Sequence, residues 1–438
     1  MSQSAVRRLP TKMSFGEKER NTILTNCSVI CNNTYRLIVA NLKRNNSSDV
    51  GNGNNELDNA SNDNAANSVH KLEAKLWCEV MKFKDTNDLN VISFLHGFYV
   101  TLLQTVNLLI NSRKCDPYFI LSSSLSTRTA NKCEHILLYN ILIRLGDLNR
   151  YLRNQSMAKL YYSQARDLNP QRGHAYNQLA LIAINDGIKS IYYYVRAFLA
   201  SEEPFTMAEN NLKSAVTRFS ITIPAIKALF DRSQDSFDLT SINNLLYIAV
   251  IAIYAENVKF ILKPLILETL NWLRLQTIKS PPSSPSSSGK EIRFTFLNST
   301  DSKCLLPSLL TLMDYLLTQQ QQGSNDVNLN DCESIVSELK CETDLFLSQN
   351  ADLIALQADR SKALKHDYIL LGFSPLKQVH EQLKFDENPQ ETKNQHVILI
   401  SRISEKIDKL LAIIKEKKQE TKSKKSRNIA LQSILSNK

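Results

Sequence analysis

The side chains that could perform catalysis or bind a metal are scattered along this chain of 438 residues. None of the seven histidines belongs to an HExxH motif, and no serine or cysteine has the sequence context of an activated nucleophile. Among the eight cysteines, Cys27 and Cys31 are one helical turn apart, but no further Cys or His completes a metal site, so we interpret them as reduced core residues. The sequence therefore predicts a protein that is not an enzyme and has no cofactor or metal.

Composition and charge restrict the class of protein further. A hydrophobic content of 43% over this length can bury a large core and indicates two or three domains. With 10 glycines and 12 prolines, the chain is poor in the turn residues of strand-rich folds, which predicts an all-α protein. The net charge of +10 indicates an anionic partner, but nucleic acid, phosphoprotein and acidic peptide satisfy it equally. The first residues lack the apolar core of a signal peptide, and no apolar run reaches the ~18 residues of a membrane span, so we expect a cytoplasmic protein that could also shuttle to the nucleus.

The stretch from Tyr139 to Pro204 contains an internal repeat, and binding residues within this stretch would be positioned by its helices. The spacing of its small, aromatic and proline residues is typical of a tetratricopeptide helix–turn–helix, which has a period of about 34 residues. The residues that fit are Leu145, Gly146, Ala158, Tyr162, Ala165 and Pro170 in the first copy and, less well, Leu179, Ala180, Tyr192, Arg196, Leu199 and Pro204 in the second. The small residues allow two antiparallel helices to approach closely, and the prolines end the second helix of each pair.

Several stretches resemble one family. GDLNRYL at 146–152 resembles the phosphate-binding helix of 14-3-3 proteins, and the run that follows, through YYYVRA and PF with an Asn-Leu six residues on, resembles the 14-3-3-like domain of the SMG family. That family, related to the Ever Shorter Telomeres factors, includes the nonsense-mediated mRNA decay adaptors SMG-five, SMG-six and SMG-seven. NWLRLQT at 271–277, LLPSLL at 305–310 and LLGFSPL at 370–376 resemble its C-terminal helical domain. The short linker at 153–159 is more similar to SMG-seven than to SMG-five.

The resemblance implies a phosphopeptide-binding site. A phosphoserine needs clustered cations with a fixed fork and a neutral donor, and the match assigns these roles to Arg150 and Tyr151. The match also assigns Lys82 as a point charge, or Lys84 if the alignment is shifted by two residues. It assigns Asn177 to orient the backbone of the bound peptide. The second arginine of a 14-3-3 pocket has no counterpart here, which would lower the affinity. Taken alone, an Arg-Tyr pair would more often pack within the helix bundle.

The resemblance also implies a function and partners. We expect a non-enzymatic adaptor that binds the phosphorylated up-frameshift RNA helicase and recruits a protein phosphatase or mRNA decay factors. It would form a heterodimer with a paralogous SMG protein through an interface that includes Gly97 and Phe98. Nothing resembles the PIN nuclease of some relatives. Two alternatives stay open: a telomerase-associated factor that binds single-stranded nucleic acid, and a tetratricopeptide scaffold that binds unmodified peptide.

These expectations divide the chain into domains. Residues 1–235 would form a 14-3-3-like bundle with tetratricopeptide-like hairpins, interrupted by a disordered insertion at 45–67. Residues 236–416 would form an α-helical hairpin domain with a flexible loop at 278–291, and 417–438 a basic tail that is solvated, directs nuclear import or makes a weak RNA contact. Hydrophobic periodicity predicts helices at 17–42, 70–84, 89–112, 133–152, 205–219, 221–231, 239–256, 260–276, 305–317, 328–340, 342–365 and 397–418.

Overall fold

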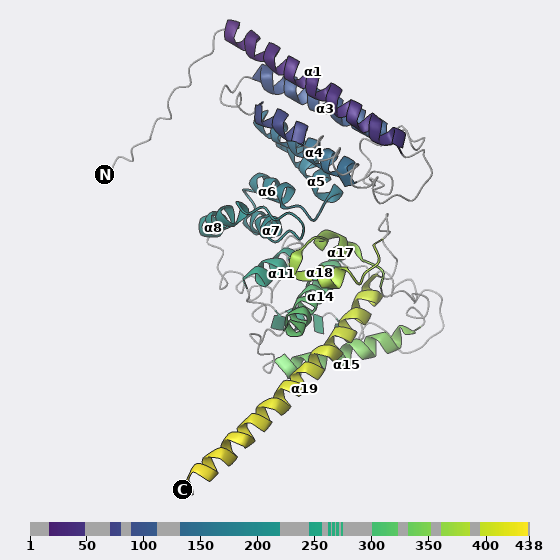
Figure 1. The fold of residues 1–438 in the computed structure, drawn as a ribbon. Helices are drawn as coiled ribbons and strands as arrows, with labels where there is room; N and C mark the ends of the chain where they lie inside the picture. The colour runs from purple at the N-terminus through teal and green to yellow at the C-terminus, as the bar shows by residue number, and fades with distance from the viewer. Residues whose placement is uncertain are drawn as a thin grey trace, which may run out of the picture. The chain divides into compact units, whose positions relative to one another are not determined.

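The described part of the chain is helical. The computed structural model describes residues 17–48, 71–79, 89–111, 132–219, 245–255, 300–322, 332–351, 361–385 and 395–436, and part of 262–274. Within these ranges the regular elements are α-helices and one short 3-10 helix, with three isolated β-bridges (Figure 1). The predicted all-α fold is confirmed. The predicted disordered insertion began too early, because residues 45–48 belong to the end of α1, and its remainder, 49–67, lies outside the described residues. The flexible loop at 278–291 and the domain boundary at 233–238 lie outside them entirely, so the predicted domain division stays a prediction.

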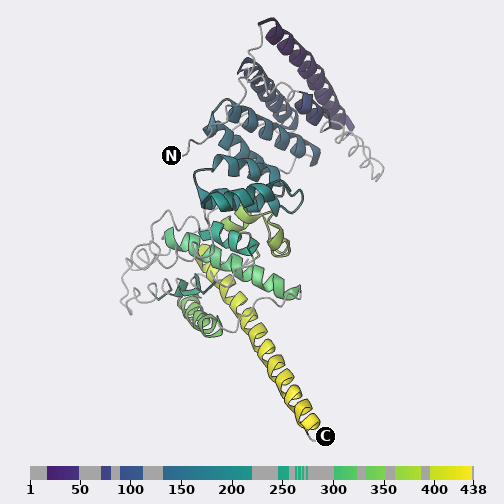
Figure 2. The ribbon, with the colours of Figure 1, turned by 90° about the vertical axis from the view of Figure 1, so that its left-hand side faces the viewer.

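Contacts divide the chain into two compact units, residues 1–170 and 171–438. The first unit contains α1 (Glu17–Ser48), α3 (Leu89–Asn111), α4 (Lys132–Tyr151) and α5 (Gln155–Leu168), together with helical residues 71–79. Each of the four long helices packs on the next one along the chain, so that they form a series of layers (Figures 1 and 2). Part of α3, Leu89–Leu109, is long and apolar enough to span a membrane by length and composition. Because α3 packs between α1 and α4, we interpret it as a helix of the bundle.

Helices α4 and α5 form the first predicted hairpin. Ala158 and Ala165 are fully buried, and a Cβ atom added at Gly146 would lie within 2.8 Å of three ring atoms of Tyr162. Gly146 is therefore the position that lets the aromatic ring of the repeat lie against α4. Between the helices, Arg153 has a φ of 60° and the Asn154 side chain caps α5 by accepting a hydrogen bond from Met157 N at 3.3 Å.

The second unit begins with the other predicted hairpin, α6 (Gly173–Ile182) and α7 (Gly187–Phe198), followed by α8 (Ala208–Phe219). Its remaining elements are α11 (Leu245–Tyr254), α14 (Thr300–Gln321), α15 (Glu333–Gln349), α17 (Lys365–Leu370), η4 (Ser374–Leu376), α18 (Lys377–His380) and α19 (Gln395–Ser436). Helix α7 packs on α6, α8 and α11, whereas α19 packs on α14 and α15. A single helix α15 replaces the separate helices predicted on either side of residue 341. Helix α19 continues well past its predicted end at 418 (Figure 1).

A buried arginine joins the second hairpin to a segment far along the chain. Arg196 of α7 is fully buried and donates hydrogen bonds of 2.7 Å to the main-chain oxygens of Ile369 and Leu371. It also donates to the Tyr176 hydroxyl at 2.8 Å and lies over the rings of Tyr176 and Phe373. Residues 370–376 are the LLGFSPL stretch, so this arginine fixes that stretch against the repeat.

We expect Gly146→Ala to lower the free energy of unfolding by about 1–3 kcal/mol, because the new methyl group would overlap the Tyr162 ring. Gly97→Ala is the matched control, since a Cβ atom at this exposed helical position would have no atom of the described ranges within 4 Å. It should stabilise the protein by up to about 1 kcal/mol through helix propensity alone. Urea denaturation measures both effects. Equal effects of the two substitutions would show that Gly146 has no role in close packing.

Candidate phosphate-binding site

The candidate site lies at the C-terminal end of α4, where neighbouring side chains fix the Arg150 guanidinium. Its Nη2 lies 3.3 Å from Asp147 Oδ1, and its Nε donates to the Tyr162 hydroxyl at 3.4 Å. The guanidinium carbon also lies 4.7 Å from the centre of the Tyr151 ring. The side chain is 31% exposed, so a cation held by three neighbours is still open to solvent on one side.

The electrostatics of this cluster keep Arg150 charged. Burial opposes the charged guanidinium, but the hydrogen bond with Tyr162 and the charge of Asp147 raise its pKa above the ordinary value. The Tyr162 hydroxyl donates to Asp147 Oδ1 at 2.6 Å, and burial together with this carboxylate raises the pKa of Tyr162. Tyr162 therefore stays a neutral donor, and Asp147 accepts from both side chains. The cluster can present an oriented cation to an anionic ligand.

A second network attaches helical residues 71–79 to α4. Glu73 Oε1 is buried and accepts from Arg144 Nε at 3.0 Å and from the Tyr99 hydroxyl at 3.2 Å, while the Arg144 guanidinium lies 4.6 Å from the Trp77 ring centre. Burial is the main cause of the raised pKa of Tyr99, and the negative charge of Glu73 raises this pKa further. The network attaches residues 71–79 to α4 at Arg144, which lies six residues before Arg150. The predicted lysines, Lys82 and Lys84, lie outside the described residues.

Asn177 lies in the second unit, on α6, and is 4% exposed. Its Oδ1 accepts a hydrogen bond from Asn211 Nδ2 of α8 at 3.0 Å. The hydrogen bond fixes the orientation of this amide within the second unit. The pairing partner was not predicted, although Asn211 belongs to the Asn-Leu that stands six residues after Phe205.

The structure places the predicted residues in three groups. Arg150 and Tyr151 are adjacent in the last turn of α4, while Asn177 belongs to the other unit. Gly97 and Phe98 lie on α3, where Gly97 is exposed and Phe98 packs edge-on to Tyr99 with ring centres 5.2 Å apart. The binding and interface roles stay predictions.

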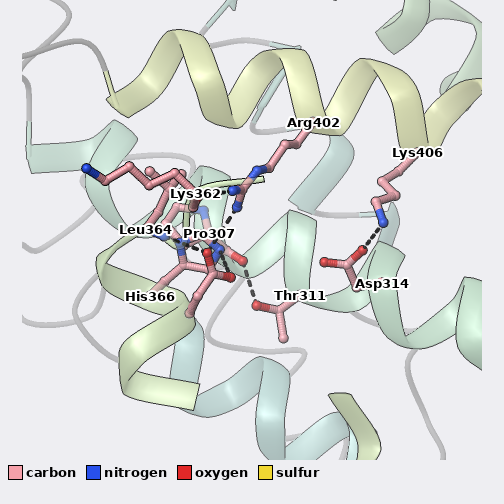
Figure 3. Close-up of polar contacts among 9 residues, drawn as sticks. Pro307, Thr311, Asp314, Lys362, Leu364, His366, Arg402 and Lys406 are labelled. Carbon is pink, nitrogen blue, oxygen red and sulfur yellow. Dashed lines mark hydrogen bonds and ion pairs between the residues drawn. The ribbon is translucent and has the colours of Figure 1, made fainter. Parts of the chain in front are cut away.

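The second unit also contains a buried polar network (Figure 3). Asp367 Oδ2 accepts from Arg402 Nη1 at 3.0 Å and from Leu364 N at 2.7 Å, and Arg402 Nη2 donates to the Lys362 carbonyl. Burial opposes the charged form of Asp367, but the charges of His366 and Arg402 lower the pKa of this carboxyl below its ordinary value. The hydrogen bond between Asp367 and Arg402 joins α17 to α19. Both residues are at most 7% exposed, so the network is not open to a substrate. Across the described ranges, no group of three or more His, Cys, Asp or Glu could hold a metal ion.

Comparison with known proteins identifies the family. Residues 158–435, more than half of the chain, match the family model described as the Est1 DNA/RNA binding domain. The chain belongs to this family, as its resemblance to Ever Shorter Telomeres factors predicted.

Individual relatives share shorter stretches. The chain is 34% identical over 135 residues to the nonsense-mediated mRNA decay factor SMG7 of Danio rerio, a match that covers 28% of this chain and 11% of that protein. It is 36% identical over 99 residues to an SMG7-like factor of Arabidopsis thaliana (20% of this chain, 11% of that protein). It is 36% identical over 81 residues to the telomerase-binding protein EST1A of Danio rerio (17% and 5%). The match thus spans about a tenth or less of each relative's own length. A chain of the C. elegans SMG5-SMG7 complex aligns with 90% of this chain and 100% of its own length, at 16% identity and a TM-score of 0.38.

Buried histidines of the second unit should make the protein sensitive to mild acid. Burial lowers the pKa of both His380 and His396 to about 4, with Arg196 also contributing at His380. Since an unfolded histidine titrates near 6.5, the unfolded chain binds more protons between these pH values, and stability should fall as pH decreases from about 6.5 to about 4. Urea denaturation across this range measures the slope. His396→Gln should reduce it, whereas the same change at half-buried His135 serves as control; identical slopes in both variants would contradict the prediction.

Proposed function

We propose that the chain is a non-enzymatic adaptor in nonsense-mediated mRNA decay that binds a phosphorylated protein through Arg150 and Tyr151. The observation that carries the proposal is the geometry of Arg150, a charged and oriented guanidinium that remains 31% exposed beside a tyrosine. The relatives named as nonsense-mediated mRNA decay factors support the pathway. The expected ligand is the phosphorylated up-frameshift RNA helicase.

The chemistry of a phosphoserine suits this arrangement. The phosphate carries nearly two negative charges and three strong acceptor oxygens at neutral pH. Two nitrogens of Arg150 are already held by Asp147 and Tyr162, which fixes the plane of the fork before the ligand arrives. Less side-chain entropy is then lost on binding. Lys82 would add a second charge.

The adaptor would recruit a protein phosphatase or mRNA decay factors as part of a heterodimer with a paralogous SMG protein. The exposed face of α3 supports such an interface, because Ser93, Gly97 and Thr101 form a row of small residues at helical spacing. Phe98 is half-buried beside this row, and Leu108 further along the helix is 69% exposed. A helix of the paralogue could approach closely along the row and cover the neighbouring apolar side chains.

Removing the Arg150 fork should weaken phosphopeptide binding at least tenfold, since each charge-assisted hydrogen bond contributes roughly 1.5–3 kcal/mol. Arg150→Glu should bind more weakly than Arg150→Ala, because the reversed charge adds repulsion. Lys82→Glu should act in the same direction but less strongly. Calorimetric titration of a phosphoserine-glutamine peptide and its unphosphorylated twin measures these affinities.

Lys159→Glu, at an exposed position of α5, is the matched control for a change of charge and should bind like wild type. A melting curve for each variant shows whether the α4–α5 hairpin is intact. If the two peptides bind equally well, or if Arg150→Glu binds normally, Arg150 and Tyr151 are packing residues and the chain is a phosphate-independent scaffold.

Gly97→Glu should abolish association with an SMG5-type paralogue while the melting temperature stays within a few degrees of wild type. The large charged side chain would separate the two helices, whereas among the described residues of this chain nothing lies within 4 Å of the new Cβ atom. Light scattering after gel filtration of the mixed proteins measures the complex, with Gly97→Ala as the control that retains it. A Gly97→Glu variant that unfolds, or one that still associates, would contradict the interface.

A further inference from the structure

The second unit contains a pocket of about 390 Å³ that the candidate phosphate-binding site does not use. Its walls come from the ends of α7 and α11, the last turns of α14, and η4 with the start of α18 (Figure 1). These elements pack on one another, since α11 contacts both α7 and α14, and α14 contacts η4 and α18. Pockets that enclose an organic ligand have volumes of roughly 300–1,000 Å³, so this one is large enough to hold part of a binding partner.

The wall at residues 373–375 is fixed before any ligand binds. Ser374 N donates a hydrogen bond to the Leu199 carbonyl at 3.0 Å, which attaches η4 to the end of α7. Gly372 has a φ of 77°, and this left-handed conformation allows the turn that leads into η4. The buried Arg196 also holds the carbonyl groups that precede this turn. Because the wall is already ordered, a ligand would lose little free energy in ordering it.

Two tyrosines supply aromatic surface to the pocket. Tyr254 lies at the end of α11, and Phe198 of α7 packs edge-on against its ring, with the ring centres 6.2 Å apart. Tyr315 lies on α14 and is 9% exposed. Pro375 and two aliphatic side chains complete the apolar half of the lining. The pocket therefore offers flat apolar surfaces whose positions are set by packing.

The other half of the ten lining residues carries hydroxyl or amide groups, and none of the ten has a charged side chain. The amides belong to Gln319 and Gln322 of α14 and to Gln378 of α18. Gln322 and Gln378 are exposed, so the pocket is open to solvent on their side. An amide has two donor hydrogens and an acceptor oxygen, so these side chains can pair with the backbone of a peptide.

We propose that this pocket binds an uncharged, proline-rich segment of a partner protein in the polyproline II conformation. Such a segment has no internal hydrogen bonds, so its carbonyl oxygens are free to accept from the glutamine amides. Its proline rings would pack on Tyr254 and Tyr315, as in other aromatic-lined grooves that bind proline-rich ligands. This inference goes beyond the proposed phosphopeptide function and does not depend on Arg150.

The lining distinguishes this ligand from other classes of partner. A phosphorylated peptide or a nucleic acid requires cations, and none of the lining residues is a cation. An amphipathic helix, about 10–12 Å wide, requires a continuous apolar groove, whereas hydroxyl and amide groups make up half of this lining. A proline-rich segment needs only aromatic surface and a few donors, and it loses little entropy because its conformation exists before binding.

Fluorescence anisotropy of labelled decaproline with the full chain tests the proposal. Decaproline should bind at least about fivefold more tightly than a peptide of the same length made of Gly-Ser repeats, because the latter has no rings to pack on the tyrosines. Since the lining is uncharged, the affinity should change less than about twofold when potassium chloride is raised tenfold. Arg150→Glu should leave decaproline binding unchanged, which separates this pocket from the phosphate-binding site.

Replacing Gln322 and Gln378 together by glutamate should weaken decaproline binding at least about fivefold, because a carboxylate cannot donate to the carbonyls and repels them. Both positions are exposed, so the melting temperature should stay close to that of wild type. The control is the double variant Gln321→Glu and Gln382→Glu, which makes the same change of charge at exposed positions outside the lining. This control should bind decaproline like wild type.

Three results would overturn the proposal: no binding of decaproline, equal binding of the Gly-Ser peptide, or equal losses in the two double variants. Tighter binding of an apolar α-helical peptide than of decaproline would also overturn it, in favour of a partner helix.

Discussion

The second unit depends on the burial of one cation. A guanidinium transferred from water to a protein interior must recover its lost hydration from fixed dipoles. Arg196 recovers it from the carbonyl groups of Ile369 and Leu371, from tyrosine hydroxyls and from the faces of Tyr176 and Phe373. These partners lie up to 175 positions away along the chain, so α7 and residues 369–371 can separate only if the buried charge loses its hydrogen bonds. The same charge helps to keep His380 neutral.

In the first unit, packing and the candidate site share the same residues. Tyr162 is the aromatic residue of the repeat and lies against Gly146, and its hydroxyl also contacts Asp147 and Arg150. The ring therefore sets the distance between α4 and α5 while the hydroxyl sets the orientation of the arginine. A change that alters the hairpin would also move the cation. The ion pair of Glu73 with Arg144, which lies six residues before Arg150 on α4, plays a similar part by attaching helical residues 71–79 to α4.

Local spacing predicted the fold better than it predicted the polar contacts. The hairpin helices and the close approach at Gly146 followed from residue sizes at a fixed period, and the structure confirms them. The single helix α15 was missed because polar residues near 341 weaken the periodic signal without breaking the backbone. Asp147 was not recognised as a partner because a carboxylate three residues from an arginine on a helix is common. The carbonyl partners of Arg196 could not be predicted, since main-chain groups leave no trace in the sequence.

The change of surroundings along α19 gives one continuous helix two levels of local stability. Amide groups near Ile407 and Leu410 lie where the helix packs on α14 and α15, so their exchange with solvent deuterium requires the packed layer to open. Amide groups past Lys418 can exchange when a few turns unwind by themselves. The boundary between slow and fast exchange should therefore fall within one turn of the Lys418–Glu333 ion pair, although the backbone hydrogen-bonding pattern is the same on both sides.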